Sequence, residues 1–552
     1  MSRTGLVIRR ECTSGIAPGG GTRRRVGTPE AEATMALMSH RPPGHWIIVV
    51  VGSVAVTALV AVGAATRGAP LAPAGDFHVI AARVASRPLS TGVLDPPSLG
   101  GSQGAIAYRK LRRTGARFVR MHVLWERVAP AGETRPTGFD ARNPGDPRYR
   151  WAQTDNEVRL AVRNGFAPIV YVQTAPAWAE NGRPLRANDG PVRPSPTALA
   201  DFATALANRY SGAFGGLPRV RYWQVWNEPN LNIQLMPQFV DGKPASPEWY
   251  RAMVNAMAGA VHAVRRDNVV IAGGLAPFGG DSNDPSGGNV PEQERIRPLQ
   301  FMRELLCMSA GAKPRATCAA KTEFDAWAHH PYTYGGPTHD AFHPDDVSLG
   351  DLGEMRSLLT AAAKSGHVRS RGGPAFWVTE FSYDSKPADP KGLAPELHAR
   401  WVSEALYRMW KEGVSHVTWF LLRDEPFPDG MFQSGLYLRS SSGIAGDRPK
   451  LALRAFRFPF VAFWERSGSI SYWGRTPAGV RKSVVVEQKA GGGWRSVAEP
   501  SVDRYGIFVG RIIDVRGSGT LRARLANGSD SSVPFSLEVR KDFRFCPWGS
   551  FC

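Results

Sequence analysis

The sequence has few of the residue patterns that mark metal, nucleotide or nucleic-acid sites. It has only five cysteines in 552 residues, none in a Cys-x-x-Cys pair and none with a histidine at ligand spacing, so a zinc site is not expected. No Gly-x-Gly-x-x-Gly follows the first expected strand, which argues against a dinucleotide cofactor. The formal net charge is +20, but the densest basic group is Arg23 to Arg25. We therefore expect charge spread over the surface, no nucleic-acid partner, no metal and no organic cofactor.

One long stretch carries no charge at all. Residues 46–65, WIIVVVGSVAVTALVAVGAA, would span about 30 Å as a helix, which is enough to cross a membrane. The arginines before it favour a cytoplasmic N-terminus and an exported body. Its length favours an uncleaved anchor, although Ala72-Pro73-Ala74 resembles a signal-peptidase site and would release a secreted protein. Met35 is an alternative start of the chain.

The cysteines are compatible with export, because four of them form two pairs that are close in sequence. Cys307 lies near Cys318, and Cys546 lies near Cys552. Each pair could close a small disulfide-bonded loop outside the cell. Cys12 precedes the apolar stretch and would be left without a partner.

Beyond the apolar stretch, the chain reads as a linker and two domains. Residues 66–76 are rich in small residues and proline, and residues 1–45 form a basic tail. From 77 to 464, short apolar runs alternate with amphipathic helical patterns, which is typical of parallel βα units. From 465 to 552 the chain shows only short strand patterns and turns, which predicts a small β-sandwich. This domain either binds glycan or braces the barrel, and the lack of an obvious stripe of exposed aromatic residues favours the brace.

The alternating region predicts a closed (β/α)8 barrel, with an open doubly wound sheet as the alternative. Seven runs are candidate strands, and an eighth is expected near Phe77 to Ala81. Helices are expected at 195–210 with Ser195 as N-cap, at 246–265 with Ser246 as N-cap, and at 395–412 ending before Gly413. The seven candidate strands are 117–125, 167–174, 219–226, 268–274, 324–330, 374–380 and 415–421.

Two of these strands end in a glutamate. The run RYWQVWNEPN, residues 221–230, delivers Glu228 at the end of the fourth strand, and Pro229 stops the strand there. The run PAFWVTE delivers Glu380 at the end of the seventh strand. Catalytic groups of such barrels lie at the carboxyl ends of the strands, and the fourth and seventh strands face each other across the mouth. Two facing carboxyl groups suit glycoside hydrolysis, in which one protonates the leaving oxygen and the other attacks the anomeric carbon.

The two motifs resemble a known group of enzymes. VWNEPNL at 225–231 is similar to the acid/base signature of clan A retaining glycoside hydrolases, most of all to glycoside hydrolase family 39, and WVTEFSY at 377–383 is similar to its nucleophile strand. That family includes β-xylosidases, α-L-iduronidases and bacterial exopolysaccharide endoglycosidases, and the resemblance spans about residues 77–460. It implies that Glu228 is the acid/base, that Glu380 is the nucleophile and that Asn227 binds the sugar 2-hydroxyl. Because the acid must start protonated, we expect the charge of Glu380 to raise the pKa of Glu228.

The resemblance also suggests further site residues by their context. Arg120, on the second strand, stands where clan A enzymes keep an arginine that favours a charged nucleophile. His330 and Tyr332, after the sixth strand, resemble an element whose phenol hydrogen-bonds the nucleophile. Trp419, on the last strand, resembles a platform beneath the sugar, and Trp178 is a weaker candidate for the cleft. Two further weak candidates for the cleft are Trp125 and Trp226.

The leading hypothesis is therefore an exported, retaining glycoside hydrolase that acts on an extracellular or cell-envelope carbohydrate. A catalytically silent carbohydrate-binding barrel and a transglycosidase are the alternatives. The loop after the third strand, QTAPAWAENG, carries no obvious sugar-selecting residue. The sugar, the linkage, exo or endo action and the oligomeric state all stay open.

The apolar stretch at 46–65 generates a prediction about topology. Protease added to intact cells is expected to degrade the barrel and to spare the N-terminal tail, because the tail lies on the cytoplasmic side of the membrane. Immunoblotting with antibodies against each part reads the result. Full protection of the barrel would contradict this topology.

Overall fold

The computed structural model describes most of the chain that follows the predicted linker. It describes residues 79–80, 86–184, 189–280, 295–465, 468–513, 519–538, 543 and 545–551. The predicted tail, membrane helix and linker lie outside these residues. Within the described part, none of the helices has the length and apolarity that a membrane span requires.

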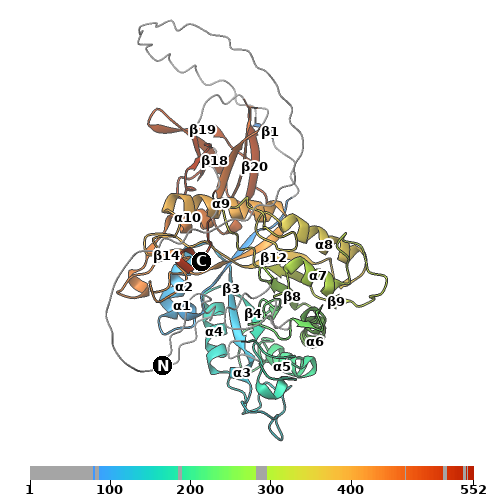
Figure 1. Cartoon of the computed structure of the whole chain (residues 1–552). Coiled ribbons are helices and arrows are strands. Elements are labelled where there is room, and N and C mark those ends of the chain that lie inside the picture. The colour runs from blue at the N-terminus through green and yellow to red at the C-terminus, as the bar shows by residue number, and fades with distance from the viewer. Residues whose placement is uncertain are drawn as a thin grey trace, which may run out of the picture. The chain divides into compact units, whose positions relative to one another are not determined.

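Eight parallel strands close into a barrel (Figure 1). Each strand pairs with its neighbours in parallel register, and the last pairs with the first, so the predicted (β/α)8 barrel is confirmed and the open sheet is excluded. In order round the barrel the strands are β2 (Ser90–Leu94), β3 (Phe118–Leu124), β4 (Ala167–Gln173), β5 (Tyr222–Val225), β8 (Val269–Leu275), β10 (Ala326–His329), β12 (Ala375–Phe381) and β13 (Val414–Phe420).

The predicted position of the first barrel strand was wrong. The residues expected to form it contain β1 (Val79–Ile80), which instead pairs antiparallel with β20 (Ile507–Ile512) in the C-terminal domain. The barrel begins with β2, whose sequence STGVL has few of the apolar residues that mark a strand. Gly92 lies at a crowded point of this strand, where a Cβ would stand 3.1 Å from the Cβ of Phe118. The strand count is unchanged, so β5 is still the fourth strand and β12 the seventh.

Helices surround the barrel strands (Figure 1), and two of the three predicted helix ends are confirmed. Ser195 caps α5 by accepting a hydrogen bond from the Ala198 amide, and α9 ends just before Gly413, which has φ +87°. Helix α6 is capped differently, because its N-cap is Ala245 and the Ser246 hydroxyl donates to Gln238 instead. The helices are α1 (Pro96–Leu99), α2 (Gly104–Arg112), α3 (Trp125–Val128), α4 (Ala152–Arg163), α5 (Pro196–Arg209), α6 (Ser246–Val264), α7 (Pro298–Leu306), α8 (Leu352–Lys364), α9 (Pro395–Lys411) and α10 (Leu451–Arg457).

Side chains fill the inside of the barrel below the site. Ile169, Ile271 and Trp377 form a buried cluster with small residues of β10, and Phe118 packs against them. The His416 ring packs between Phe118 and Trp377, with centroid distances of 4.9 Å and 4.8 Å. The interior is therefore a packed core, in which His416 bonds the hydroxyls of Ser90 and Thr418.

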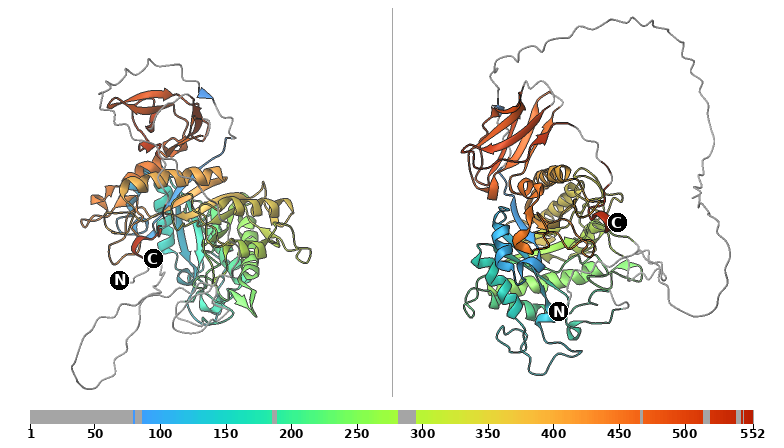
Figure 2. Two further views of the ribbon diagram at one scale, coloured as in Figure 1. Left: turned by 45° about the horizontal axis from the view of Figure 1, so that its top comes forward. Right: turned by 90° about the vertical axis from the view of Figure 1, so that its left-hand side faces the viewer.

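The C-terminal domain is a sandwich of two antiparallel sheets (Figure 2), as predicted. One sheet has the order β1-β20-β17-β16 and the other the order β19-β18-β21-β22. It begins at Phe460 instead of 465, because β16 belongs to the first sheet. Aromatic contacts of Tyr407 with Phe463 and of Trp410 with Trp473 join it to α9. Its remaining strands are β16 (Phe460–Trp464), β17 (Ile470–Arg475), β18 (Val484–Ala490), β19 (Gly493–Ala498), β21 (Thr520–Leu525) and β22 (Phe535–Ser536).

Short strands and disulfides secure the loops. The predicted bond between Cys307 and Cys318 is present. Cys546 is also disulfide-bonded, while its predicted partner Cys552 lies outside the described residues. The short strands are β6 (Phe239–Val240), β7 (Lys243–Pro244), β9 (Thr322–Glu323), β11 (Val368–Arg369), β14 (Tyr437–Leu438) and β15 (Arg448–Pro449).

Candidate active site

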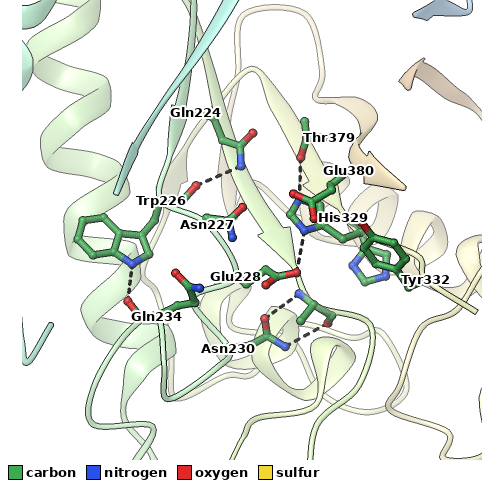
Figure 3. A network of polar contacts seen from close by, with 12 residues as sticks. Gln224, Trp226, Asn227, Glu228, Asn230, Gln234, His329, Tyr332, Thr379 and Glu380 are labelled. Carbon is green, nitrogen blue, oxygen red and sulfur yellow. Dashed lines mark hydrogen bonds and ion pairs between the residues drawn. The ribbon is translucent and has the colours of Figure 1, made fainter. Parts of the chain in front are cut away.

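Glu228 and Glu380 meet at the carboxyl ends of β5 and β12 (Figure 3). One carboxylate oxygen of each lies within 4.8 Å of the other, and both side chains are largely buried. The sequence therefore predicted the central pair and the two strands that carry it.

An irregularity in β12 turns Glu380 toward the barrel mouth. Val378 is opposite Val417 and Phe381 is opposite Trp419, so β12 has one more residue than β13 between these pairs. A bulge of this kind redirects side chains, and it lets Glu380 face inward together with its neighbour Thr379. Both residues make their hydrogen bonds inside the mouth.

A tight turn after β5 places Glu228. Trp226 and Glu228 have φ values of +64° and +44°, an unusual left-handed conformation that is found at functional sites. The Glu228 amide donates to the carbonyl of Gly274, at 2.9 Å. Gly274 itself has φ +64°, and a Cβ there would lie 2.6 Å from the Gln224 amide nitrogen. The turn thus depends on close packing against a glycine of β8.

Arg120, from β3, connects the two sides of the site. Its guanidinium donates to Glu380 Oε2 at 2.9 Å and to Asn227 Oδ1 at 2.6 Å. It also donates to Gln224 Oε1 at 3.2 Å and lies 4.0 Å from the centre of the Tyr171 ring. The side chain is fully buried, so its charge is balanced by Glu380 instead of by water.

Glu228 has a different environment from Glu380. Its Oε1 lies 2.9 Å from His330 Nδ1, and the other nitrogen of that ring lies 3.1 Å from the Thr379 hydroxyl. Burial lowers the pKa of His330 to about 3, so the ring is neutral at pH 7 and supplies no positive charge. Burial also raises the pKa of Glu228 from 4.5 to about 7, against the opposing charges of Arg120 and Arg295. The predicted rise in pKa is therefore confirmed, but desolvation causes it rather than the charge of Glu380.

Tyr332 completes the surroundings of Glu380. Its hydroxyl donates to Glu380 Oε1 at 3.0 Å, and Arg120 donates to Oε2, so both oxygens of that carboxylate accept hydrogen bonds. Burial and the negative charges of Glu380 and Glu228 raise the pKa of Tyr332 well above its ordinary value. The phenol thus stays protonated and remains a donor over the whole physiological range.

The structure adds polar residues that the sequence analysis did not identify. Gln224 and Thr379 hold Arg120 and His330 in place. Asn230 fixes the loop after Glu228. Its side-chain amide donates to the carbonyls of Ala276 and Ile296, and its Oδ1 accepts a hydrogen bond from the Ala276 amide. Gln224 had a visible signal, since it is a polar residue inside the apolar run RYWQVW.

The predicted platform tryptophan lies elsewhere. Trp419 is 1% exposed and packs on the outer side of β13 against Phe456 and His398. Its indole N–H donates to the carbonyl of Ser434. This position does not suit a sugar platform, and the assignment of Trp419 to the site was wrong. Trp419 follows Thr418 on a regular strand, so its side chain points outward to the helices.

The three weaker tryptophan candidates also lie away from the glutamates. Trp178 is partly exposed, donates to the carbonyl of Pro130 and packs edge-on against Trp125. Trp125 stacks on Phe202 of α5, and Trp226 is fully buried. Their described contacts belong to the core and its margin.

A metal ion would have to compete for the same atoms. Single ligand atoms of Glu228, His330 and Glu380 lie within 4.8 Å of one another. The oxygens of Glu380 are already engaged by Arg120 and Tyr332, and a divalent cation would be repelled by the buried guanidinium. The arrangement is better suited to proton transfer and nucleophilic attack than to holding a metal.

Comparison with known proteins adds only a general likeness. No protein-family model and no curated protein matches this sequence. Among solved structures, the chain is similar to a monomeric beta-xylosidase from Caulobacter crescentus CB15, with 16% identity, 77% of this chain and 95% of that chain covered, and a TM-score of 0.44. It is also similar to a glucosidase from Croceicoccus marinus (14% identity, 77% and 96% covered, TM-score 0.40). A third similar structure is a GH30 endoxylanase from Clostridium papyrosolvens C71, with 12% identity, 77% of this chain and 93% of that chain covered, and a TM-score of 0.39.

Likenesses this weak do not establish a shared activity. The chain is a (β/α)8-barrel protein with two buried glutamates at the mouth of the barrel. Its chemistry has to be argued from those residues.

The raised pKa of Glu228 predicts a pH-dependent change in stability. Because the folded-state pKa is about 7 instead of 4.5, the folded state favours the protonated carboxyl. This contribution is complete below about pH 4.5 and is lost as the pH rises to about 7, for a total of roughly 3 kcal/mol. Glu228→Gln cannot ionise, so it lacks this loss. As the pH rises from 4.5 to 8, its free energy of unfolding minus that of the wild type should increase by about 3 kcal/mol.

Chemical denaturation at several pH values measures this difference. Glu396→Gln is the matched control, because Glu396 is exposed in the first turn of α9. A difference between wild type and Glu228→Gln that does not change with pH would show that Glu228 is not buried as a neutral acid.

Proposed function

We propose that this protein is a retaining glycoside hydrolase. The observation that carries the proposal is the close, asymmetric pair of glutamates. Glu228 and Glu380 have oxygens within 4.8 Å of each other, near the separation of about 5–5.5 Å typical of retaining enzymes and short of the roughly 6.5–9.5 Å that inverting enzymes need for a water. The different surroundings of the two carboxyl groups support separate roles for them.

In the first step, a Glu380 oxygen attacks the anomeric carbon of the bound sugar. The bond from that carbon to the glycosidic oxygen breaks, and the leaving oxygen takes the proton of Glu228. The Arg120 and Tyr332 hydrogen bonds hold Glu380 in position for this attack. The pKa of Glu228, about 7, leaves about half of the acid protonated at pH 7 and most of it protonated below that pH.

In the second step, the now ionised Glu228 takes a proton from water. The water oxygen attacks the anomeric carbon, the ester to Glu380 breaks, and the sugar leaves with its original configuration. In this mechanism Asn227, whose Oδ1 accepts a hydrogen bond from Arg120 at 2.6 Å, binds the sugar 2-hydroxyl. Both carboxyl groups return to their starting protonation.

We further propose that the enzyme works outside the cytoplasm on an extracellular or cell-envelope carbohydrate, attached by the apolar stretch at 46–65 or secreted after its removal. The similarity to glycoside hydrolase family 39 rests on the motifs around Glu228 and Glu380 and stays a prediction. A transglycosidase would share the same first step. A silent binding barrel is less consistent with the site, because binding alone gives no reason to bury two carboxyl groups side by side.

The separate roles predict that alanine variants of the two glutamates behave differently. Glu380→Ala should lose nearly all turnover, because no ester can form. Glu228→Ala should still form the ester from a 4-nitrophenyl glycoside, whose leaving group needs no proton, and added azide should restore turnover by replacing the water that Glu228 activates. Near-native activity of Glu380→Ala would contradict this assignment.

The measurement uses release of nitrophenol from xyloside, glucoside, arabinoside and uronide derivatives, with and without azide. Glu396→Ala serves as the matched control, because Glu396 is an exposed glutamate of α9 and should retain wild-type kinetics. Azide that restores Glu380→Ala with retained configuration, and not Glu228→Ala, would reverse the two roles.

A further inference from the structure

The C-terminal tail, residues 545–551, returns from the sandwich to the mouth of the barrel (Figure 2). The Trp548 ring lies 5.4 Å from the ring of Tyr332, the residue that hydrogen-bonds Glu380. It also meets the ring of Tyr334 edge-on at 5.8 Å. Trp548 therefore lies one side chain away from the proposed nucleophile, although it follows the whole sandwich in the sequence.

Apolar residues of the barrel strands and of the loop after β13 pack against Trp548. Trp548 packs against a cluster formed by the ends of β2, β4 and β13 and by the loop that follows β13. This cluster includes Tyr171, on whose ring Arg120 lies. Unlike the fully buried Trp419, Trp548 is only partly buried. The buried members of the cluster are Leu94, Tyr171, Phe420, Leu421 and Phe432.

Specific contacts hold the tail in this position. The Ser550 amide donates to Asp389 Oδ2 at 2.7 Å, and the Ser550 hydroxyl bonds the other oxygen of the same buried carboxylate. The Asp384 amide donates to the carbonyl of Pro547 at 2.9 Å. Gly549 has φ +57°, and a Cβ there would collide with the Asp389 carboxylate. The segment is thus fitted to the loop that follows Glu380.

We propose that Trp548 forms an aromatic wall of the sugar-binding site beside Glu380. Sugar rings present flat patches of C–H groups that pack on aromatic faces, and Trp combines a large apolar area with few rotatable bonds. The tail thereby supplies the aromatic surface that the sequence analysis assigned to Trp419. This inference rests on the proposed glycosidase function and names a residue that determines substrate affinity.

The test compares Trp548→Ala, Trp548→Phe and Gly549→Ala on the 4-nitrophenyl glycosides named above. Trp548→Ala should raise KM about tenfold with little change in kcat, because stacking binds substrate and transition state alike. Trp548→Phe should keep most of the affinity. Gly549→Ala should resemble Trp548→Ala, because the clash with Asp389 displaces the tail. Trp464→Ala, at a 37% exposed tryptophan of the sandwich, is the matched control.

Thermal unfolding of each variant shows whether the fold is intact. Calorimetric titration of the same glycosides into Glu380→Gln, with and without Trp548→Ala, measures binding in the absence of turnover. Unchanged KM and unchanged binding in Trp548→Ala, with an active wild type, would overturn the inference and leave the proposed function standing. A rise in kcat/KM would also overturn it, because it would mean that the tail blocks the site. A wild type that neither binds nor cleaves any of these glycosides would overturn both proposals.

Discussion

The buried guanidinium of Arg120 is the interaction on which the site depends. It is withdrawn from water and is satisfied by Glu380, Asn227 and Gln224, which come from two other strands of the barrel and the turn that follows one of them. Removing one partner of a buried ion pair typically costs about 3–5 kcal/mol, because the other charge is left uncompensated. The guanidinium therefore sets the spacing between the β5 and β12 sides of the mouth, and with it the separation of the two glutamates.

The two glutamates are similarly buried but differently compensated. Glu380 accepts hydrogen bonds from the Arg120 guanidinium and the Tyr332 phenol. Glu228 faces a neutral histidine, and burial alone raises its pKa to about 7. The two carboxyl groups thus differ in their hydrogen-bond partners rather than in their depth.

Local sequence predicted the barrel and the meeting of Glu228 and Glu380 at its mouth, because both have local signals. Buried parallel strands read as apolar runs, and a glutamate directly after such a run must appear at the barrel mouth. The first strand, STGVL, lacks that signal, whereas the run near Phe77 to Ala81 has it and contains a strand of the C-terminal domain. The rise in the pKa of Glu228 comes from desolvation, which depends on packing that no short motif reveals.

The aromatic surroundings of the site could not be predicted, for a different reason. Trp419 was placed in the site by its strand, but the alternation of β13 points it to the helices. Trp548 lies far along the chain, after the whole sandwich, and reaches Tyr332 only because Asp389 and Ser550 fix the tail. Contacts between such distant segments leave no periodic pattern in the sequence.

The most direct test of this account is to trap the proposed ester. Activated 2-deoxy-2-fluoro derivatives of xylose, glucose, arabinose and glucuronic acid slow the second step more than they slow the first, so a retaining enzyme accumulates the glycosyl ester. Mass spectrometry of digested protein should find one sugar attached to the peptide that carries Glu380, and none in Glu380→Gln. Attachment at Glu228 instead, or cleavage of a natural substrate with inverted configuration and no adduct, would contradict it.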